Sequence, residues 1–439
     1  MIDAQADWLK NISPLDGRYR VKVHELGEYF SEGALIKARV KVEIVYLIKL
    51  TEFLNIGSER KLLKVRNLID WGEKLTDKDL LKVKEIEKEI NHDVKAVEYF
   101  IRENLKKLKL EKLSVWIHWG LTSEDVNNLA YGLLLSRFNQ EQLLVGEKQL
   151  LKKILLMAEK YQMVVMPGRT HGQLAVPTTM GKELAVFADR ADFWLKKLQA
   201  VKFGGKLNGA VGNFNAQMAI YPEKDWQKFS QEVVESLGLE AVAVTTQIEP
   251  GDRLAYWLDL VKGLNNVWLN LSQDAWLYVA LDYWQQKAVK KEVGSSTMPQ
   301  KVNPIDFENA EGNLEIANAL LGLMAEKLTI SRLQRDLSDS TVKRNLGVAL
   351  GHTVLAMKSL LKGLGKVAPN QEKLKQELAE HPEMLAEAEQ LKLKTEGDAE
   401  AYEKIKKLTR GKKKGYWGEV EKYIGLAVNI TKQTVRRLK

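Results

Sequence analysis

A short polar segment near residue 300 has residue types that could support proton transfer. Residues 293–309 read VGSSTMPQKVNPIDFEN, with long helical patterns on both sides. Glycine and small serines allow backbone motion, which is typical of a lid over an active site. Lys301 and Asn303 would bring a cation and an amide to a helix N-terminus. Ser295 could be a nucleophile or a base, because backbone N–H groups and Lys301 could stabilise its alkoxide.

Five other polar segments interrupt the apolar pattern of the chain. They are SPLDGRYR (13–20), NHDVKAVEYF (91–100), LTSEDVNN (121–128), GRTHGQ (168–173) and QRDLSDSTVKRN (334–345). Together they carry arginines, hydroxyls, amides and histidines. This inventory suits a substrate with a phosphate and carboxylates, together with acid–base chemistry. A structural role stays open for each, because serine and threonine at a helix start are often only N-caps.

Several kinds of chemistry are not expected from this chain. It has no cysteine, which excludes disulfides, thiolate nucleophiles and cysteine-bound zinc. The six histidines form no HExxH motif and no carboxylate-rich cluster, so no metal is expected. The glycine-rich segment 202–216 lacks the residue order of a phosphate-binding loop. We interpret it as a loop in which backbone segments approach closely.

The formal net charge of +9 could attract nucleic acid or an anionic small molecule. Basic and acidic residues are interleaved throughout, however, so a lysine-rich surface is the favoured interpretation. The basic run at 404–415 has few aromatic neighbours, which argues against a nucleic-acid-binding tail. The N-terminus has no apolar signal core, and no run of about 18 apolar residues occurs. We therefore expect a cytoplasmic protein that binds neither nucleic acid nor membrane.

Long helices must position these polar segments. Apolar residues recur every three or four positions over 123–161, 180–201, 254–289, from Asn303–Pro304 onward, and over about 338–364. Alternating strand patterns are few, and 241–249 is the best candidate. The pattern predicts an all-α protein with a central bundle of long helices. Such a bundle exposes apolar side surface, so we expect an oligomer.

Changes in composition predict three helical domains. The first helical stretch ends near residue 110 in a lysine-rich run, and a second change falls at 366–370. The predicted domains are an N-terminal helical domain at 1–112, the central long-helix bundle at 113–365 and a C-terminal helical domain at 366–439.

Several motifs resemble a known family. GSSTMPQKVNP resembles the signature of the fumarase/aspartase superfamily, and TSEDVNN and GRTHGQ are similar to two further blocks of it. SPLDGRY, NHDVKAVEYF and QRDLSDSTVKRNLG resemble the adenylosuccinate lyases of the bacterial type. The resemblance covers nearly the whole chain in the same order and is weakest in the predicted C-terminal domain.

The resemblance implies a function in purine biosynthesis. Members of the family eliminate fumarate from adenylosuccinate, which gives AMP, and from succinyl-aminoimidazole carboxamide ribotide. The resemblance also implies a fumarase/aspartase-like fold and a homotetramer with active sites shared between subunits. It implies no cofactor and no metal.

The resemblance also implies roles for individual residues. Ser295 would be the general base that removes the proton from the succinyl carbon. His171 would be the general acid that protonates the departing nitrogen. Lys301 and Asn303 would hold the succinyl carboxylates and stabilise the aci-carboxylate intermediate. The other implied substrate-binding residues are Arg18, Tyr19, Asn91, His92, Asp93, Thr122, Ser123, Gln247, Ser296, Val302, Asn309, Arg335, Ser340, Thr341 and Arg344.

Two positions depart from the family pattern, and two alternative functions stay open. Gln300 stands where this branch of the family has histidine, and Leu174 stands where proline is expected. Another fumarate-releasing lyase is one alternative, although the arginine-bearing segments 13–20 and 334–345 favour a nucleotide substrate. An inactive basic helical scaffold is the other. The presence of Ser295, His171 and Lys301 together argues against a scaffold.

Overall fold

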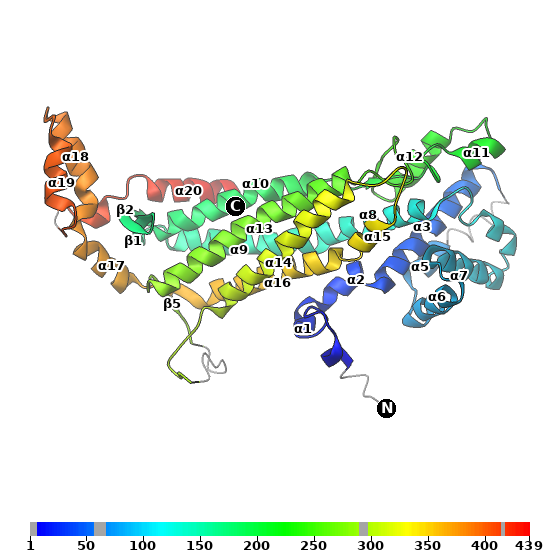
Figure 1. The fold of residues 1–439 in the computed structure, drawn as a ribbon, viewed down its shortest axis with the longest axis horizontal. Helices are drawn as coiled ribbons and strands as arrows, with labels where there is room; N and C mark the ends of the chain where they lie inside the picture. Colours follow the sequence, from blue (N-terminus) through cyan, green and yellow to red (C-terminus); the bar gives the residue numbers. More distant parts are fainter. Residues whose placement is uncertain (1–6, 57–66, 289–296, 414–417) are drawn as a thin grey trace. The chain divides into compact units, whose positions relative to one another are not determined.

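The computed structural model describes residues 7–56, 67–288, 297–413 and 418–439, and these residues are mostly helical (Figure 1). The chain divides into two compact units, each assembled from three stretches of sequence. Unit 1 comprises residues 1–145, 197–262 and 316–354, and unit 2 comprises residues 146–196, 263–315 and 355–439. The division into three domains stays a prediction.

Unit 1 has an apolar core built around α3, a helix of 22 residues. Ser31 caps α3, because its hydroxyl accepts a hydrogen bond from the backbone N–H of Ala34 (3.1 Å). Val40 and Leu47 of α3 pack in one buried cluster with Val97 of α7. The helices that begin this unit are α1 (Arg20–Val23), α2 (Gly27–Phe30), α3 (Glu32–Phe53), α5 (Leu68–Glu73), α6 (Asp77–Ile90) and α7 (Asp93–Lys107).

The predicted long helices are confirmed. They are α8 (Ser123–Phe138), α9 (Leu144–Lys160), α10 (Met180–Ala200), α13 (Asp252–Ala280), α14 (Ile305–Leu328) and α16 (Leu346–Lys366). A π-helical turn at Asn139–Leu143 joins α8 to α9. The Asn139 side chain accepts a hydrogen bond from Trp257 Nε1 (3.0 Å) inside this turn. The single pattern at 123–161 therefore contains an irregularity that periodicity alone does not reveal.

Two helix boundaries differ from the prediction. The helix predicted from 254 to 289 ends at Ala280, where Asp282 adopts φ +57° and the N–H of Tyr283 bonds to Tyr278 O. This hydrogen bond and the left-handed residue are features of a Schellman motif. The helix predicted from 338 to 364 is split into α15 (Ser338–Lys343) and α16. The side chain of Asn345 bonds to Thr341 O (3.1 Å), the carbonyl that its backbone N–H would bond in a continuous helix.

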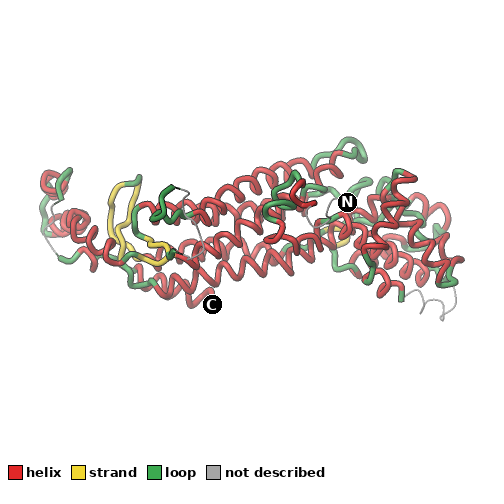
Figure 2. The backbone as a smooth tube through the Cα atoms, turned by 90° about the horizontal axis from the view of Figure 1, so that it is seen from below, coloured by secondary structure: helices red, strands yellow, loops and turns green. Residues whose placement is uncertain are grey.

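The strands are short, as Figure 2 shows. β1 (Val165–Thr170) pairs antiparallel with β2 (Gln173–Thr179), and β5 (Trp284–Gln286) pairs antiparallel with β6 (Val367–Pro369). The strand predicted at 241–249 is wrong except at its first residue, because β4 covers only Glu240–Ala241 and pairs parallel with β3 (Gly204–Gly205). Beyond it, Thr245 hydrogen-bonds to a side chain of the glycine-rich loop instead of to a neighbouring strand.

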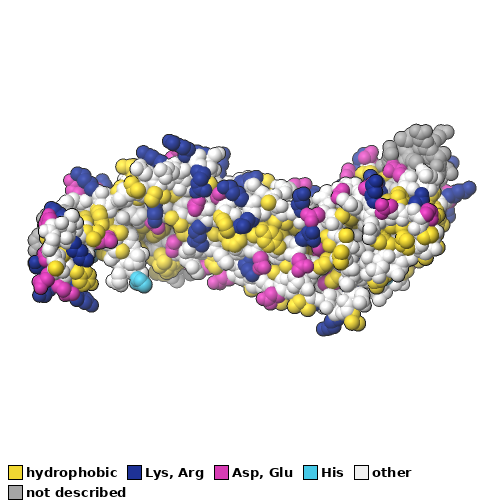
Figure 3. Space-filling view, turned by 90° about the horizontal axis from the view of Figure 1, so that it is seen from above, with side chains coloured by type: hydrophobic (Ala, Val, Ile, Leu, Met, Phe, Trp, Pro, Cys, Tyr) yellow, Lys and Arg dark blue, Asp and Glu magenta, His cyan; other side chains and the backbone are white. Residues whose placement is uncertain are grey.

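The remaining helices are short. They are α11 (Asn215–Ile220) and α12 (Trp226–Ser236) in unit 1, and α17 (Gln371–Glu380), α18 (Ala386–Thr395), α19 (Ala401–Thr409) and α20 (Ala427–Leu438) in unit 2. In the described part of the chain, no helix combines the length and apolar character that a membrane span requires. Figure 3 shows basic and acidic side chains interleaved over the face in view, in agreement with a lysine-rich surface.

Candidate functional site

The predicted site residues fall into two groups, one in each unit. Ser295 and Ser296 lie outside the described residues, as does part of the predicted lid at 293–302. The group in unit 1 contains the residues predicted to bind the nucleotide. The group in unit 2 contains His171 and the predicted residues from Lys301 to Asn309.

The N-terminus of α8 carries two of the predicted binding residues. Thr122 is the N-cap, and it forms a capping box with Asp125. The backbone N–H of Thr122 donates to the Asp125 carboxylate (2.9 Å). Ser123 is the first residue of the helix. The predicted helix start is therefore confirmed, and the cap involves the Thr122 side chain.

A buried ion pair ties α8 to the glycine-rich loop. Lys206 Nζ lies 2.7 Å from Asp125 Oδ1, and both side chains are fully buried. The same carboxylate accepts hydrogen bonds from the backbone N–H groups of Asn208 and Gly209. Lys206 Nζ also donates to the backbone oxygen of Gln247 (3.0 Å). The ion pair thus holds Gln247, a predicted site residue, near the start of α8.

The glycines of this loop permit the close approach that its composition predicts. A Cβ on Gly205 would lie 2.5 Å from Leu129 Cδ2. A Cβ on Gly212, whose φ is +83°, would lie 2.3 Å from Thr245 O. Any larger side chain at either position would displace its neighbours.

Arg335 lies at the centre of a polar network next to α8. Its guanidinium contacts Glu124 Oε2 (3.2 Å) and donates to Gln247 Oε1 (3.3 Å). Lys343 contacts the other oxygen of Glu124 (3.1 Å) and Asp339 (2.9 Å). Burial lowers the pKa of Lys343, but the two carboxylates outweigh this effect and raise it. Two cations and two carboxylates therefore balance in a mostly buried cluster.

Arg344 lies in a second cluster of unit 1. Its guanidinium is 3.5 Å from Asp93 and 3.4 Å from Glu32. Arg39 makes a shorter ion pair with Asp93 (2.6 Å). Burial raises the pKa of Asp93, but Arg39 and a backbone N–H outweigh this effect and hold it below its ordinary range. The structure thus brings together Asp93 and Arg344, which are far apart in sequence.

The two residues before Asp93 connect α6 to α7. Asn91 ends α6 in the left-handed conformation, with φ +52°. His92 is the N-cap of α7, and its Nδ1 accepts a hydrogen bond from the backbone N–H of Lys95 (3.2 Å). This hydrogen bond requires the neutral tautomer with the proton on Nε2. Both residues are exposed, so substrate could reach them.

Ser340 and Thr341 occupy α15, which lies between the two arginines in sequence. Burial raises the pKa of the Tyr131 hydroxyl on α8, and the cations Arg39, Arg344 and Lys343 oppose this effect without cancelling it. Tyr131 is not among the site residues predicted from the sequence. Arg39, Lys206 and Lys343 are not among them either; of these only Arg39 gives a signal in the sequence, as a charged residue inside an apolar helix.

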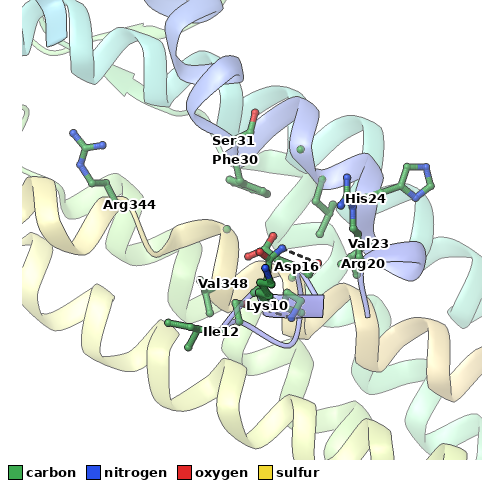
Figure 4. A pocket seen from close by; sticks show the side chains of 17 residues that line it. Lys10, Ile12, Asp16, Arg20, Val23, His24, Phe30, Ser31, Arg344 and Val348 are labelled. Atoms are coloured by element: carbon green, nitrogen blue, oxygen red, sulfur yellow. Dashed lines mark hydrogen bonds between the residues drawn. The ribbon is translucent and has the colours of Figure 1, made fainter. Parts of the chain in front are cut away.

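A pocket of about 920 Å³ lies beside the second cluster, between the N-terminal segment and the start of α16. Figure 4 shows Arg344 at one side of this pocket and His24 at the other. Lys10 and Arg20 also line it, together with Asp16. Its basic lining would suit an anionic ligand.

Arg18 and Tyr19 come directly before Arg20 in the sequence. Arg20 is among the described residues that line this pocket, but Arg18 and Tyr19 are not. The Arg18 guanidinium lies 6.0 Å from the centre of the Tyr19 ring, and Lys22 lies over the same ring. A nucleotide-binding role for Arg18 and Tyr19 stays a prediction.

His171 in unit 2 lies at the tip of a β-hairpin and not in an irregular loop. A two-residue turn, His171–Gly172, joins β1 to β2, with Thr170 paired to Gln173. Both turn residues have positive φ, +52° and +74°. Positive φ at both central positions is the signature of a type I′ hairpin turn, whose twist matches the flanking strands. The turn leaves His171 exposed.

The last two residues of the predicted lid, Lys301 and Val302, lie shortly before α14. Lys301 and Val302 are exposed, and Asn303 is followed by Pro304, which directly precedes the first helical residue, Ile305. Asn309 lies one turn into α14, where its Oδ1 accepts a hydrogen bond from Ser359 Oγ of α16 (2.7 Å). The predicted helix start at 303–304 is confirmed within one residue.

The chain matches known protein families over most of its length. A family model described as lyase matches residues 17–317, and one described as adenylosuccinate lyase C-terminal matches residues 331–439. The chain is 45% identical to adenylosuccinate lyase of Haemophilus influenzae, over 93% of this chain and 90% of that protein. It is 44% identical to the Escherichia coli K12 enzyme of the same name, over 96% and 93%. For the Dictyostelium discoideum protein the identity is 45%, over 96% and 92%.

Solved structures resemble the fold. A fumarate lyase from Mesorhizobium sp. BNC1 aligns with a TM-score of 0.77 at 16% identity, over 94% of this chain and 97% of that chain. A 3-carboxy-cis,cis-muconate lactonizing enzyme from Pseudomonas putida aligns with the same TM-score and identity, over 95% and 97%. These similarities confirm the predicted all-α, fumarase/aspartase-like fold.

Proposed function

Because the chain belongs to the adenylosuccinate lyase family, we propose that it cleaves adenylosuccinate to AMP and fumarate. It would also release fumarate from succinyl-aminoimidazole carboxamide ribotide. The observation that carries the proposal is the placement of Arg335 and Arg344 just before and just after α15, which bears Ser340 and Thr341. Two arginines and two hydroxyls suit a phosphate. The other fumarate-releasing lyases of the superfamily act on substrates without one.

The proposed reaction is a β-elimination. Ser295 takes a proton from the succinyl carbon, and the electrons of that C–H bond form the C=C bond of fumarate. The C–N bond breaks as His171 donates a proton to the departing nitrogen. Lys301 and Asn303 hold the carboxylate on which negative charge develops. Placing a cation and an amide where charge develops lowers the barrier.

Arg335 and Arg344 differ in how accessible they are to the phosphate of the substrate. The Arg335 side chain is 15% exposed and is already engaged by Glu124 and Gln247. The Arg344 side chain is 47% exposed, and its two acidic contacts are longer than the 2.6 Å pair between Arg39 and Asp93. We therefore assign most of the phosphate binding to Arg344, with Arg335 fixed in place to support it.

We propose a cytoplasmic homotetramer whose subunits share active sites. The family resemblance supports this proposal. Large apolar side chains exposed on the long helices also support it, because a monomer would leave them in water: Phe193 is 55% exposed and Leu323 is 57% exposed. A chain without cysteine agrees with a reducing compartment.

The proposal is tested by mixing the purified protein with adenylosuccinate. Absorbance in the purine band should change with time, and chromatography should detect equal amounts of AMP and fumarate. A Ser295→Ala variant is the control for the chemistry. Argininosuccinate, aspartate and malate test the alternative lyases. Fumarate release from any of these three that is faster than release from adenylosuccinate would contradict the proposed substrate. Failure to form AMP from adenylosuccinate would also contradict it.

A further inference from the structure

One guanidinium holds the turn that carries His171. Arg169 of β1 donates from Nη1 to the backbone oxygen of Gly172 (3.0 Å), the second residue of the turn. Its Nη2 donates to Glu377 Oε1 of α17 (2.6 Å). Its Nε donates to the Tyr283 hydroxyl (3.1 Å). A single planar group therefore connects the hairpin tip to α17 and to the segment between α13 and β5.

Tyr283 and Glu377, which accept hydrogen bonds from Arg169, also contact each other and further partners. The Tyr283 hydroxyl donates to Glu377 Oε1 (2.8 Å), so Arg169, Tyr283 and Glu377 form a closed triangle of hydrogen bonds. Tyr283 is 1% exposed, and the Glu377 side chain is 10% exposed. The second oxygen of Glu377 faces Lys373 (3.6 Å). Burial raises the pKa of Tyr283 to about 12, so its hydroxyl keeps the proton that it donates.

The hairpin turn needs such support. Turn residues at a hairpin tip have few packed neighbours, and His171 is exposed. A hydrogen bond from a charged donor is about twice as strong as a neutral one, and the Arg169 bond to Gly172 is of this kind. A general acid must be held within about 0.5 Å of its productive position. The backbone of the turn fixes the position of the His171 Cα atom, from which the imidazole side chain extends.

We propose that Arg169, Tyr283 and Glu377 are positioning residues that fix the peptide turn bearing His171 for proton transfer. The inference rests on the proposed function, in which His171 is the general acid. None of the three acts on the substrate itself. Their effect passes through the turn, so losing them slows the proton-transfer step and leaves substrate binding nearly unchanged.

The test compares two substitutions of one residue. Glu377→Ala removes the acceptor for both Arg169 and Tyr283, and kcat should fall about ten- to a hundredfold with little change in KM. Glu377→Gln keeps an acceptor oxygen and should retain most of the turnover. Arg437→Gln, which removes an exposed ion pair with Asp189 elsewhere in unit 2, is the control and should leave kcat unchanged. If the alanine variant fails to fold, Tyr283→Phe removes one side of the triangle and should lower kcat by a smaller factor.

A double-mutant cycle separates positioning from general destabilisation. In a His171→Ala background, Glu377→Ala should cause no further loss of the residual turnover, because its effect acts through His171. An equal further loss in that background would overturn the inference, as would an unchanged kcat in Glu377→Ala alone. Failure of the parent protein to cleave adenylosuccinate would instead overturn the proposed function.

Discussion

Lys206 and Asp125 form a fully buried ion pair, with Nζ 2.7 Å from Oδ1. Each charge has further partners: the lysine donates to two backbone oxygens, and the carboxylate accepts from backbone N–H groups. Removing one member would leave the other charge buried without its counterion, which is much more costly than losing an exposed pair.

Asp125→Asn should lower the free energy of unfolding by about 3–5 kcal/mol. The amide cannot neutralise Lys206, whose pKa is already lowered by burial. Urea unfolding measures the loss. Arg253→Gln removes a partly exposed pair with Glu240 in the same unit and should cost less than about 1 kcal/mol. Similar losses in both variants would show that Lys206 is neutral or hydrated in the folded protein.

Glu147 should make stability depend on pH. Burial raises its pKa to about 8 from 4.5, although Trp268 Nε1 donates to one carboxylate oxygen (2.6 Å). The folded protein therefore binds a proton that the unfolded chain releases between these values. The contribution of this proton to the free energy of unfolding is fully present below pH 4.5. It is lost as the pH rises to 8, by about 1.4 kcal/mol per pH unit.

Glu147→Gln should remove this slope, because an amide keeps an acceptor for Trp268 and does not titrate. The measurement is the difference in unfolding free energy between the two proteins at pH 5.5, 6.5 and 7.5. With each increase in pH, the unfolding free energy of the variant should rise relative to that of the parent. A constant difference would mean that Glu147 titrates near its ordinary pKa.

His171→Ala should lower turnover of adenylosuccinate at least about a hundredfold, the usual size of a lost acid–base group. Substrate binding, measured by calorimetry, should survive much better, because the exposed imidazole is proposed to act on the leaving nitrogen. Turnover near the parental rate would remove His171 as the acid.

Arg344→Ala should raise KM for adenylosuccinate steeply while kcat changes little. The half-exposed guanidinium is the proposed phosphate ligand. Succinyladenosine, which lacks the phosphate, is the matched control substrate, and its weaker binding should not depend on Arg344. An equal effect on both substrates would place Arg344 elsewhere in the site or in the fold.

Shared sites predict complementation between inactive variants. His171→Ala and Ser295→Ala should each be nearly inactive alone. If the two are unfolded and refolded together, about a quarter of sites should receive an intact acid and an intact base from random assembly. Activity should rise to that fraction of the parental value. Demonstrated subunit exchange without recovery would mean that both residues of a site come from one chain.

The long helices could be predicted because their signals are local. α8 begins directly after its N-cap Thr122 and has acidic residues in its first turn, and α14 begins directly after Asn303–Pro304. The β1–β2 hairpin was missed because its turn is His171–Gly172 and not a typical Asn–Gly pair. A proline and a glycine within β1 also resemble loop residues.

The supporting contacts of the site could not be predicted in the same way. Arg169 and Glu377 are 208 residues apart, and no periodicity relates them. Lys343 looks like a surface lysine in sequence, yet it lies between Glu124 and Asp339. Motifs identified the residues proposed to meet the substrate. The partners that hold those residues depend on tertiary packing, which a single sequence does not encode locally.

The assembly of each unit from three stretches of sequence has a consequence for biosynthesis. Residues 1–145 cannot complete unit 1 until residues 316–354 have left the ribosome. At about 5–20 residues per second, residues 146–354 take on the order of ten to forty seconds to make. During that time α8 lacks part of its final surroundings, such as Lys343, which contacts Glu124. Neither unit can be produced by cutting the chain at one point, because each is assembled from three separate stretches of sequence.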